Sequence, residues 1–510
     1  MDSNKKIAVN SVIIFVRLCI VTLVSVIASR LVLDALGASD FGLYNVVGGL
    51  VSVLNIINAS MMTTTYRFVA FELGKGESGQ TREVFNASFI LHAAFALFIF
   101  IVGGLVGEWY INNVMVLPLE SYDNALFVFR VSLITTCIST LIVPHQGLLV
   151  AYEKFTYTAI VDVLSQIIKI ILIFFLLHRS GYGIRTYSVI MLVFTFFNGA
   201  LFFGYNLLKY KDIISFKIVK QYRVYREMLS FALWTLFGGV ANIGKVQGSA
   251  MIVNYFWGTL VNAAYAVGNQ VSSFVNTFAS SLSSAAIPQI TKNYSSGNVN
   301  RSVSLTSYIS KYTYILMLLV AFPVILDIDF ILSIWLKEVP EGSSVFCNLI
   351  VLDGLLGCIG AGIPSLVNAI GNIRFYQIII YTFTIMGLPI SFFAYKLGLP
   401  ACSISAVFCV VTFVACLLKV ILLSKYYHVD VKPLFKISYT KMAVMTIPLL
   451  LFYLFYDPSG FSLSWHLVGL ACSEVFLIIV ILTLGLEKKE RLLVKNEVIK
   501  VINRVKIISK

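Results

Sequence analysis

Charge is scarce in this chain of 510 residues: Asp, Glu, Lys and Arg make up 12% of the sequence, whereas hydrophobic residues make up 59%. A soluble protein needs far more charge on its surface to stay in solution. Cysteine occurs only 8 times and histidine 5 times. Because there is also no CxxC pair and no nucleotide-binding glycine motif, the sequence predicts neither a metal site nor a cofactor. These shortages exclude a soluble domain and favour an integral membrane protein.

Long hydrophobic runs recur along the whole chain. A run of about 20 residues crosses the hydrocarbon core as a helix, because lipid forces the backbone to satisfy its own hydrogen bonds. The sequence therefore predicts an all-α integral membrane protein with about fourteen transmembrane helices. We expect these helices over 7–33, 42–66, 84–106, 124–148, 156–178, 187–207, 229–256, 263–287, 308–330, 346–370, 377–396, 401–424, 442–456 and 465–485.

Basic residues are concentrated in alternate loops. The chain has 38 Lys and Arg against 24 Asp and Glu, and the excess falls in segments 209–226, 425–441 and 488–510. Since Lys and Arg gather on the cytoplasmic side of membranes, this pattern predicts an even number of spans with both termini in the cytoplasm. Topology then explains the net charge of +14, and no nucleic-acid partner is needed. The amphipathic linker and tail are expected to lie on anionic membrane lipids.

An internal repeat is visible at a shift of 221 residues, which pairs Gly37 with Gly258 and Gly76 with Gly297. Because it relates two helices of the same direction, it predicts two six-helix lobes related by a pseudo-two-fold axis along the membrane normal, plus two extra C-terminal helices. The expected parts are an N-lobe over 1–210, a cytoplasmic amphipathic linker over 211–228, a C-lobe over 229–424, a cytoplasmic loop over 425–441, helices 13 and 14 over 442–485 and a basic tail over 486–510.

Cationic side chains lie deep in the predicted spans. Arg17 and Lys245 are near the centres of the first and seventh helices, where a charge facing lipid costs about 2.5–3.5 kcal/mol. We therefore expect them to face a solvated cavity between the two repeats. A cationic cavity suits an anion such as a diphosphate. The predicted diphosphate ligands are Arg17, Lys245, Lys169 and Arg130.

Polar and acidic side chains complete the predicted site. Helical stripes of polar residues are expected to line the cavity, although close packing of small residues also explains the serines. The acids within spans either couple transport to H+ or Na+ or pair with a basic residue, and the sequence leaves both open. The cavity residues are Asn45, Ser52, Asn55, Asn242, Asn269, Ser273, Asn276 and Ser280, and the acids are Asp162, Asp353 and Glu474.

The segment RLVLDALGASDFGLYNVVGG over 30–49 resembles the first-to-second-helix junction of bacterial polysaccharide export flippases. These are the Wzx-type O-antigen and capsule transporters of the MOP superfamily, kin to MATE exporters and to the lipid II flippase. The Ile-Pro-Gln sequence at 287–289 is also similar. The resemblance implies a V of two six-helix lobes, with the first, second, seventh and eighth helices lining the cavity. It also implies that the two extra helices offer a groove for a lipid tail.

The same resemblance implies a function. The substrate would be an undecaprenyl-diphosphate-linked oligosaccharide, moved from the inner to the outer leaflet of the bacterial inner membrane by alternating access, in contact with glycan polymerase machinery. Arg17 and Lys245 lie in the helices whose cations hold the diphosphate in related flippases. Two alternatives stay open. One is a MATE-type exporter of drugs or metabolites, which acidic cavity residues favour. The other is a glycan polymerase or ligase, but the short outer loops and few histidines predict no enzymatic activity.

Overall fold

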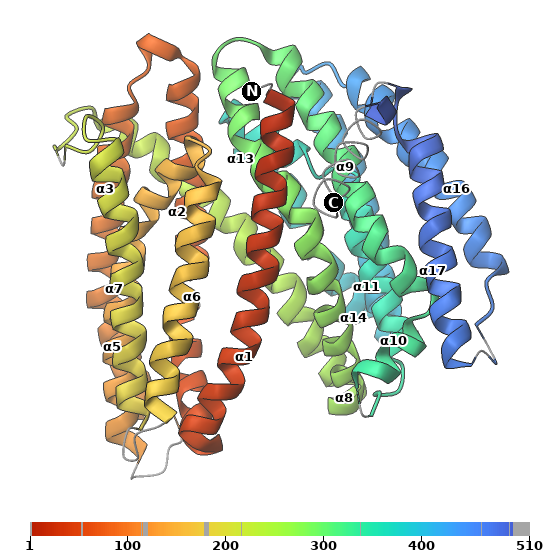
Figure 1. Ribbon diagram of the computed structural model, residues 1–510, viewed down its shortest axis with the longest axis horizontal. Helices are drawn as coiled ribbons and strands as arrows, with labels where there is room; N and C mark the ends of the chain where they lie inside the picture. The colour runs from red at the N-terminus through yellow and green to blue at the C-terminus, as the bar shows by residue number, and fades with distance from the viewer. Residues whose placement is uncertain are drawn as a thin grey trace, which may run out of the picture. The chain divides into compact units, whose positions relative to one another are not determined.

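The computed structural model of the protein describes residues 3–52, 55–113, 115, 121–177, 183–215, 217–336, 338–458, 460, 462–488 and 490–492. Within these ranges every regular element is a helix (Figure 1). The helices of the first half are α1 (Ser3–Ser52), α2 (Asn55–Gly74), η1 (Gly76–Ser78), α3 (Thr81–Phe98), η2 (Ile99–Gly103), α4 (Gly104–Asn113), α5 (Tyr122–Ala151), α6 (Phe155–Leu177), α7 (Ile184–Lys209) and α8 (Tyr222–Ser295).

The second half of the chain is equally helical. Its elements are α9 (Val299–Leu326), α10 (Ile328–Trp335), α11 (Ser343–Cys358), α12 (Ile363–Ile370), α13 (Arg374–Ile385), α14 (Gly387–Lys396), α15 (Ser403–Lys425), η4 (Leu434–Tyr439), α16 (Thr440–Phe455), α17 (Leu463–Val480) and η5 (Ile481–Gly485). The all-α membrane class predicted from the sequence is confirmed, because these helices occupy the predicted apolar runs.

The number of helices able to cross a membrane depends on how breaks are treated. Ten helices of the described chain are long and apolar enough, and α11 with α12, bent by 45°, forms an eleventh. The single element α8, which is kinked at Gly258, covers two predicted spans, 229–256 and 263–287. The predicted first span lies in α1, which carries a shorter apolar stretch, Val9–Ser25. The lower count therefore follows from merged and broken helices within the predicted spans.

Two glycines break the two longest helices in the same way. Gly37 in α1 has φ 75° and ψ 168°, and Gly258 in α8 has φ 78° and ψ −174°. Only glycine adopts this backbone region without strain. The second glycine pair of the 221-residue shift, Gly76 and Gly297, also has positive φ, at 65° and 83°. The same backbone breaks thus recur at both positions of the repeat.

The chain forms two compact units. The first comprises Met1–Asn242, Ser284–Val299 and Val367–Ile378, and the second comprises Ile243–Ser283, Asn300–Leu366 and Ile379–Lys510. The first unit therefore includes two segments of the predicted C-lobe, and the second includes the predicted helices 13 and 14. Helix α8 contributes to both units.

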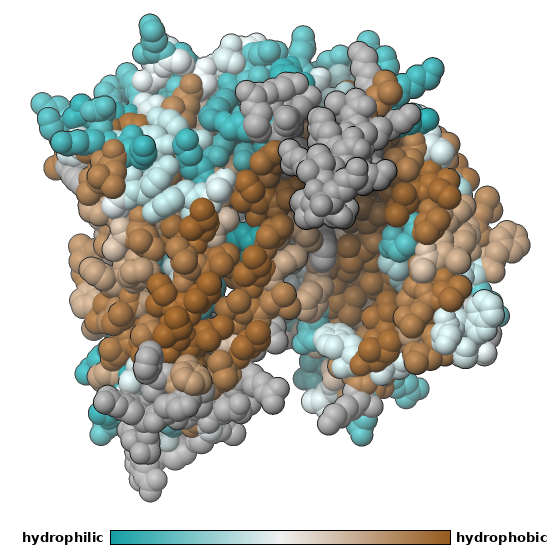
Figure 2. All heavy atoms as spheres, viewed as in Figure 1, coloured by the Kyte–Doolittle hydropathy of each residue, from teal (hydrophilic) through white to brown (hydrophobic). Residues whose placement is uncertain are grey.

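The first unit is a bundle in which α5 packs on α2, α3 and α7, and α1 packs on α6 (Figure 1). Helices in lipid associate by close van der Waals packing, so small residues lie at their contacts. A Cβ atom on Gly147 of α5 would lie 2.7 Å from Thr65 Cγ2 on α2, and one on Gly199 of α7 would lie 2.5 Å from Ile142 Cδ1 on α5. Figure 2 shows hydrophobic residues over the middle of this bundle and hydrophilic residues toward the end that carries the loop after α2.

The second unit is built around α9. Of the most apolar part of α9, 61% is buried, more than in any other candidate span of the described chain. Its residues Met317 and Leu318 pack in one cluster with Val351 of α11, Met445 of α16 and Leu477 of α17. The last two helices are therefore attached to the second unit through its core.

Candidate substrate and coupling site

The first predicted cation, Arg17, lies in an ion pair. Its Nε is 2.8 Å from Asp162 Oδ2, which joins α1 to α6 inside the first unit. Both side chains are partly exposed. Since an unpaired charge facing lipid costs about 2.5–3.5 kcal/mol, the pair explains how both groups are retained in apolar helices. A predicted diphosphate ligand and a predicted coupling acid are thus brought together.

The second predicted cation, Lys245, makes an equivalent pair in the second unit. Its Nζ donates a hydrogen bond of 2.6 Å to Asp353 Oδ2, so α8 is tied to α11. The other carboxylate oxygen accepts a hydrogen bond from the Thr412 hydroxyl on α15. Lys245 Nζ also lies 4.7 Å from the centre of the Phe408 ring, within the range of a cation–π contact. The side chains of Lys245 and Asp353 are 20% and 15% exposed, so both remain partly accessible to an ion or ligand.

Part of the polar stripe of α8 packs against α11 at Gly354. A Cβ on Gly354, the residue after Asp353, would lie 2.8 Å from Met317 Cε on α9 and 3.2 Å from Asn276 Nδ2 on α8, so α11 lies close to both helices here. The Asn276 amide donates to the Ser272 carbonyl and hydroxyl, and the Asn269 amide donates to the Tyr265 carbonyl. These amides are held against their own helix.

The other predicted polar residues divide into two groups. Asn242, Ser273 and Ser280 are exposed on α8, and the Ser280 hydroxyl donates to the Thr277 carbonyl. The predicted cavity residues Asn45, Ser52 and Asn55 have side chains that lie outside the described residues.

The remaining charged candidates lie apart from the two ion pairs. Lys169 Nζ lies 5.9 Å from the Phe194 ring on α7. Arg130 is exposed and pairs with Glu108 at 2.7 Å. Glu474 is half-buried on α17.

A buried carboxylate that sequence reasoning missed lies between α5 and α6. The Glu153 side chain is 1% exposed and its carboxylate contacts Lys6 Nζ at 3.0 Å, Lys292 Nζ at 2.8 Å and Gln289 Nε2 at 2.8 Å. Burial alone would raise the pKa of Glu153, but the charge of Lys292 and the hydrogen bonds from Lys292, Gln289 and Lys6 together outweigh burial and hold the pKa below its ordinary value. Its φ of 58° is unusual for a residue other than glycine.

Arg67 is a second buried charge, and it binds backbone carbonyls of a distant segment. Its guanidinium donates to the carbonyls of Asn368 at 2.9 Å and Ala369 at 3.2 Å, which are among the last carbonyls of α12 and lack helical partners. The ring of Phe231 lies 5.4 Å from the same guanidinium. Arg67 and Glu153 together explain why segments 284–299 and 367–378 cluster with the first unit. In the sequence, the one signal for Arg67 and Glu153 is that each is a charged residue close to the end of a predicted span.

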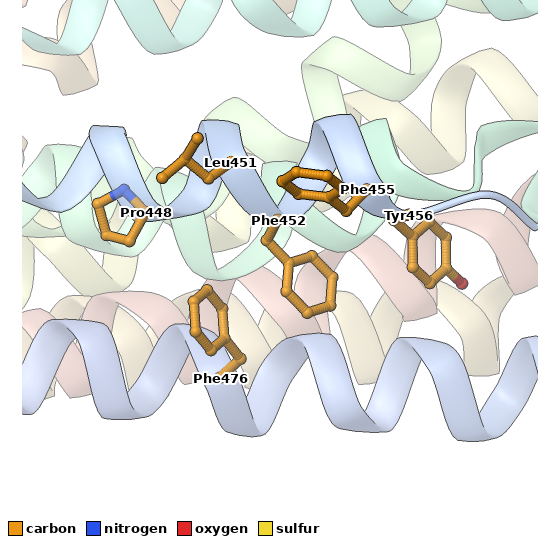
Figure 3. Close-up of a pocket in the computed structure, with 6 residues that line it drawn as sticks. All are labelled: Pro448, Leu451, Phe452, Phe455, Tyr456 and Phe476. Atoms are coloured by element: carbon orange, nitrogen blue, oxygen red, sulfur yellow. The ribbon is translucent and has the colours of Figure 1, made fainter.

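The last two helices carry an open apolar groove of about 360 Å³ (Figure 3). The rings of Phe452 on α16 and Phe476 on α17 stack with centres 4.9 Å apart, and Phe455 and Leu451 are exposed above them. Pro448 and Tyr456 complete the lining. A groove with this lining fits hydrocarbon and offers little to a polar ligand.

The fold defined by these helices is that of a class of membrane transporters, as comparison with solved structures shows. A MOP superfamily transporter from Pyrococcus furiosus, described as having a binding pocket of reversed polarity that suggests a different function, is 15% identical over 82% of this chain and 94% of that one, with a TM-score of 0.70. A multidrug resistance MATE family transporter of the MOP superfamily in an outward-facing conformation gives 16% identity, the same coverages and a TM-score of 0.70.

The MATE transporter ClbM, solved in complex with Rb+, gives a TM-score of 0.67 at 15% identity over 81% of this chain and 94% of ClbM. No protein-family model matches the sequence, and a search of the curated proteins gives no match. At this identity the comparisons establish the fold. The chain therefore has the MATE-like fold that its sequence predicts.

Proposed function

We propose that the protein is a flippase that moves an undecaprenyl-diphosphate-linked oligosaccharide from the inner to the outer leaflet of a bacterial inner membrane by alternating access. The observation that carries the proposal is that each compact unit holds a partly exposed cation at span depth, Arg17 in the first and Lys245 in the second. Arg offers a planar fork to a phosphate and Lys a compact charge, which are the two standard ways of binding a diphosphate.

The carboxylate partners give this site a mechanism. In the absence of substrate, Asp162 and Asp353 neutralise the two cations. A diphosphate competes for the same ammonium and guanidinium groups, and the displaced carboxylates then gain from binding H+ or Na+. Binding of the anion and binding of the coupling cation thereby favour each other, as linkage requires. The polar stripe of α8 would contact sugar hydroxyls.

The apolar groove between α16 and α17 supports the lipid part of the proposed substrate. Its aromatic lining could hold a segment of the polyprenyl chain while the glycan stays in water. Under the same proposal both termini lie in the cytoplasm, which the basic loops favour, and polymerase contacts would lie at the opposite surface, where the glycan emerges.

A MATE-type exporter of cationic compounds is the second candidate. Asp162 and Asp353 favour it, because a cationic substrate would take the place of Arg17 and Lys245 as their partner. Solved structures of MATE transporters also share the fold.

Binding to the purified full-length protein separates the two candidates. Undecaprenyl diphosphate and a cationic dye are titrated by native mass spectrometry against wild type, Arg17→Gln and Lys245→Gln. Arg185→Gln, an exposed arginine that donates to Asn124, is the control. We expect saturable lipid binding that both site variants weaken about tenfold, the effect of one charge-assisted hydrogen bond of about 1.5 kcal/mol. Dye binding without lipid binding would instead identify an exporter.

A further inference from the structure

One face of the first turns of α8 forms a groove whose lining includes none of the residues of the two ion pairs. Its residues recur at helical spacing, so they make a single stripe along the helix, and Leu91 of α3 closes the groove from the side. The groove has a volume of about 670 Å³ and lies within the first unit. From α8 it is lined by Tyr222, Tyr225, Arg226, Leu229, Ser230, Leu233, Trp234 and Phe237.

Two arginines from different helices stand along this stripe. Arg226 is exposed on α8, and the Arg374 guanidinium, at the start of α13, lies 5.5 Å from the centre of the Trp234 indole. Across the chain that the structure describes, neither makes an ion pair with a carboxylate. Arg226 and Trp234 are eight residues apart, about 12 Å along a helix, with the Ser230 hydroxyl between them. Two long guanidinium side chains can reach one anion across that interval.

The lining changes from polar to apolar along the helix. Tyr225 is fixed by a hydrogen bond from the Val219 amide at 3.1 Å, and Trp234 packs edge-on against Phe237 with ring centres 6.3 Å apart. Tyr and Trp prefer the boundary between lipid and water. Leu233, 52% exposed, continues the stripe toward the apolar part of α8. The groove thus combines cations, which suit the phosphate of a phospholipid, with aromatic and aliphatic surface, which suits its acyl chains.

We propose that this groove is a binding site for one anionic glycerophospholipid of the leaflet next to the basic loops. The phosphate lies between Arg226 and Arg374 near Ser230, and an acyl chain follows Leu233 and Phe237. Charge complementarity selects an anionic headgroup, because two unpaired guanidinium groups face a leaflet that carries negative lipids. The site is separate from Arg17 and Lys245, so it does not depend on which substrate the protein carries.

Native mass spectrometry of the full-length protein in detergent tests this site with phosphatidylglycerol and phosphatidylcholine as probes. Wild type should bind phosphatidylglycerol more tightly, and Arg226→Gln and Arg374→Gln should each weaken that binding about fivefold while leaving phosphatidylcholine binding unchanged. The matched control is Arg223→Gln, since Arg223 is only three residues from Arg226, 88% exposed and paired with Glu227. It should bind like wild type.

Three outcomes would overturn the proposal. Equal binding of the two phospholipids would remove the headgroup selectivity, and an equal loss in Arg223→Gln would reduce the effect to diffuse attraction. Displacement of phosphatidylglycerol by a lower concentration of undecaprenyl phosphate, lost in Arg226→Gln, would reassign the groove to the polyprenyl substrate. Since Arg17→Gln and Lys245→Gln leave this groove intact, they should keep wild-type phosphatidylglycerol binding even if the proposed transport function fails.

Discussion

Lys245 Nζ lies 2.6 Å from Asp353 Oδ2, so the central cation of α8 is neutralised by an acid of α11 within the same unit. The Thr412 hydroxyl holds the second carboxylate oxygen, and Phe408 lies against the ammonium group. The pair therefore links α8, α11 and α15 within the second unit.

Breaking this pair from one side should cost more than removing it entirely. Asp353→Asn or Lys245→Met leaves one charge uncompensated at span depth, which costs about 3 kcal/mol, whereas the double variant leaves none. Thermal unfolding in detergent should therefore rank the single variants below the double variant. Additive effects of the two substitutions would contradict a direct interaction.

Asp353→Asn should also change ligand binding in a predictable direction. The substitution frees the Lys245 ammonium, so undecaprenyl diphosphate should bind about tenfold more tightly, as one charge-assisted hydrogen bond of about 1.5 kcal/mol requires. A titration by native mass spectrometry measures the change. Weaker lipid binding in a folded Asp353→Asn protein would mean that Lys245 does not contact the diphosphate.

Glu153→Gln should destabilise the first unit. The substitution leaves Lys292 and Lys6 without their shared buried carboxylate, at a cost of about 3 kcal/mol. The control is Glu227→Gln, which removes an exposed pair with Arg223 that water screens and that contributes little to stability. Comparison of the two melting temperatures checks the prediction, and equal values would show that the Glu153 cluster contributes no more than a surface pair.

The Glu153 contribution should depend on pH with a definite sign. Its pKa in the folded protein lies below 4.5, so the stabilisation is complete above that value and is lost as pH falls through the lower folded pKa. The difference in melting temperature between wild type and Glu153→Gln should therefore be constant from about pH 7 to pH 5 and shrink below about pH 4.5. A difference that grows with acid would reverse the sign and refute the assignment.

Glu490 should anchor the end of the described chain to α9. Its carboxylate contacts Lys311 Nζ at 2.6 Å and the Tyr312 hydroxyl at 2.6 Å, and the Lys311 side chain is 0% exposed. Glu490→Ala strands this buried ammonium, so it should cost about 3 kcal/mol. Lys488→Ala, an exposed neighbour, is the control and should leave the melting temperature within about 1 °C. Equal effects would show that Lys311 has another source of stabilisation.

Gly258 should tolerate no side chain, although there is open space for one. A Cβ there meets nothing within 4 Å, so the expected cost of Gly258→Ala, about 1–3 kcal/mol, comes from the φ of 78° alone. Gly244→Ala in the same helix, also in open space but at an ordinary helical φ, should instead stabilise by about 0.5–1 kcal/mol. Melting temperatures that move in the same direction would contradict the backbone argument.

The sequence by itself determined the helical membrane class. Apolar runs dictate helices in lipid because no other open structure satisfies the backbone there. The pairing of Gly37 with Gly258 was visible as an identity at a fixed shift, and each glycine marks a break because φ near 75° excludes other residues. The depth of Arg17 and Lys245 in their spans was equally a property of the sequence.

Only the tertiary structure decided which charges meet. Arg17 pairs with Asp162, which lies in the fifth predicted span of the first repeat. Lys245 pairs with Asp353, which lies in the fourth predicted span of the second repeat. The repeat does not predict this difference, because Asp162 and Asp353 are not related by its shift. Glu153 contacts three side chains that are each more than one hundred residues away from it in the sequence. Hydropathy fixes how deep a charge lies in the membrane, but its partner depends on which helix faces pack together, and that is set by contacts between distant segments.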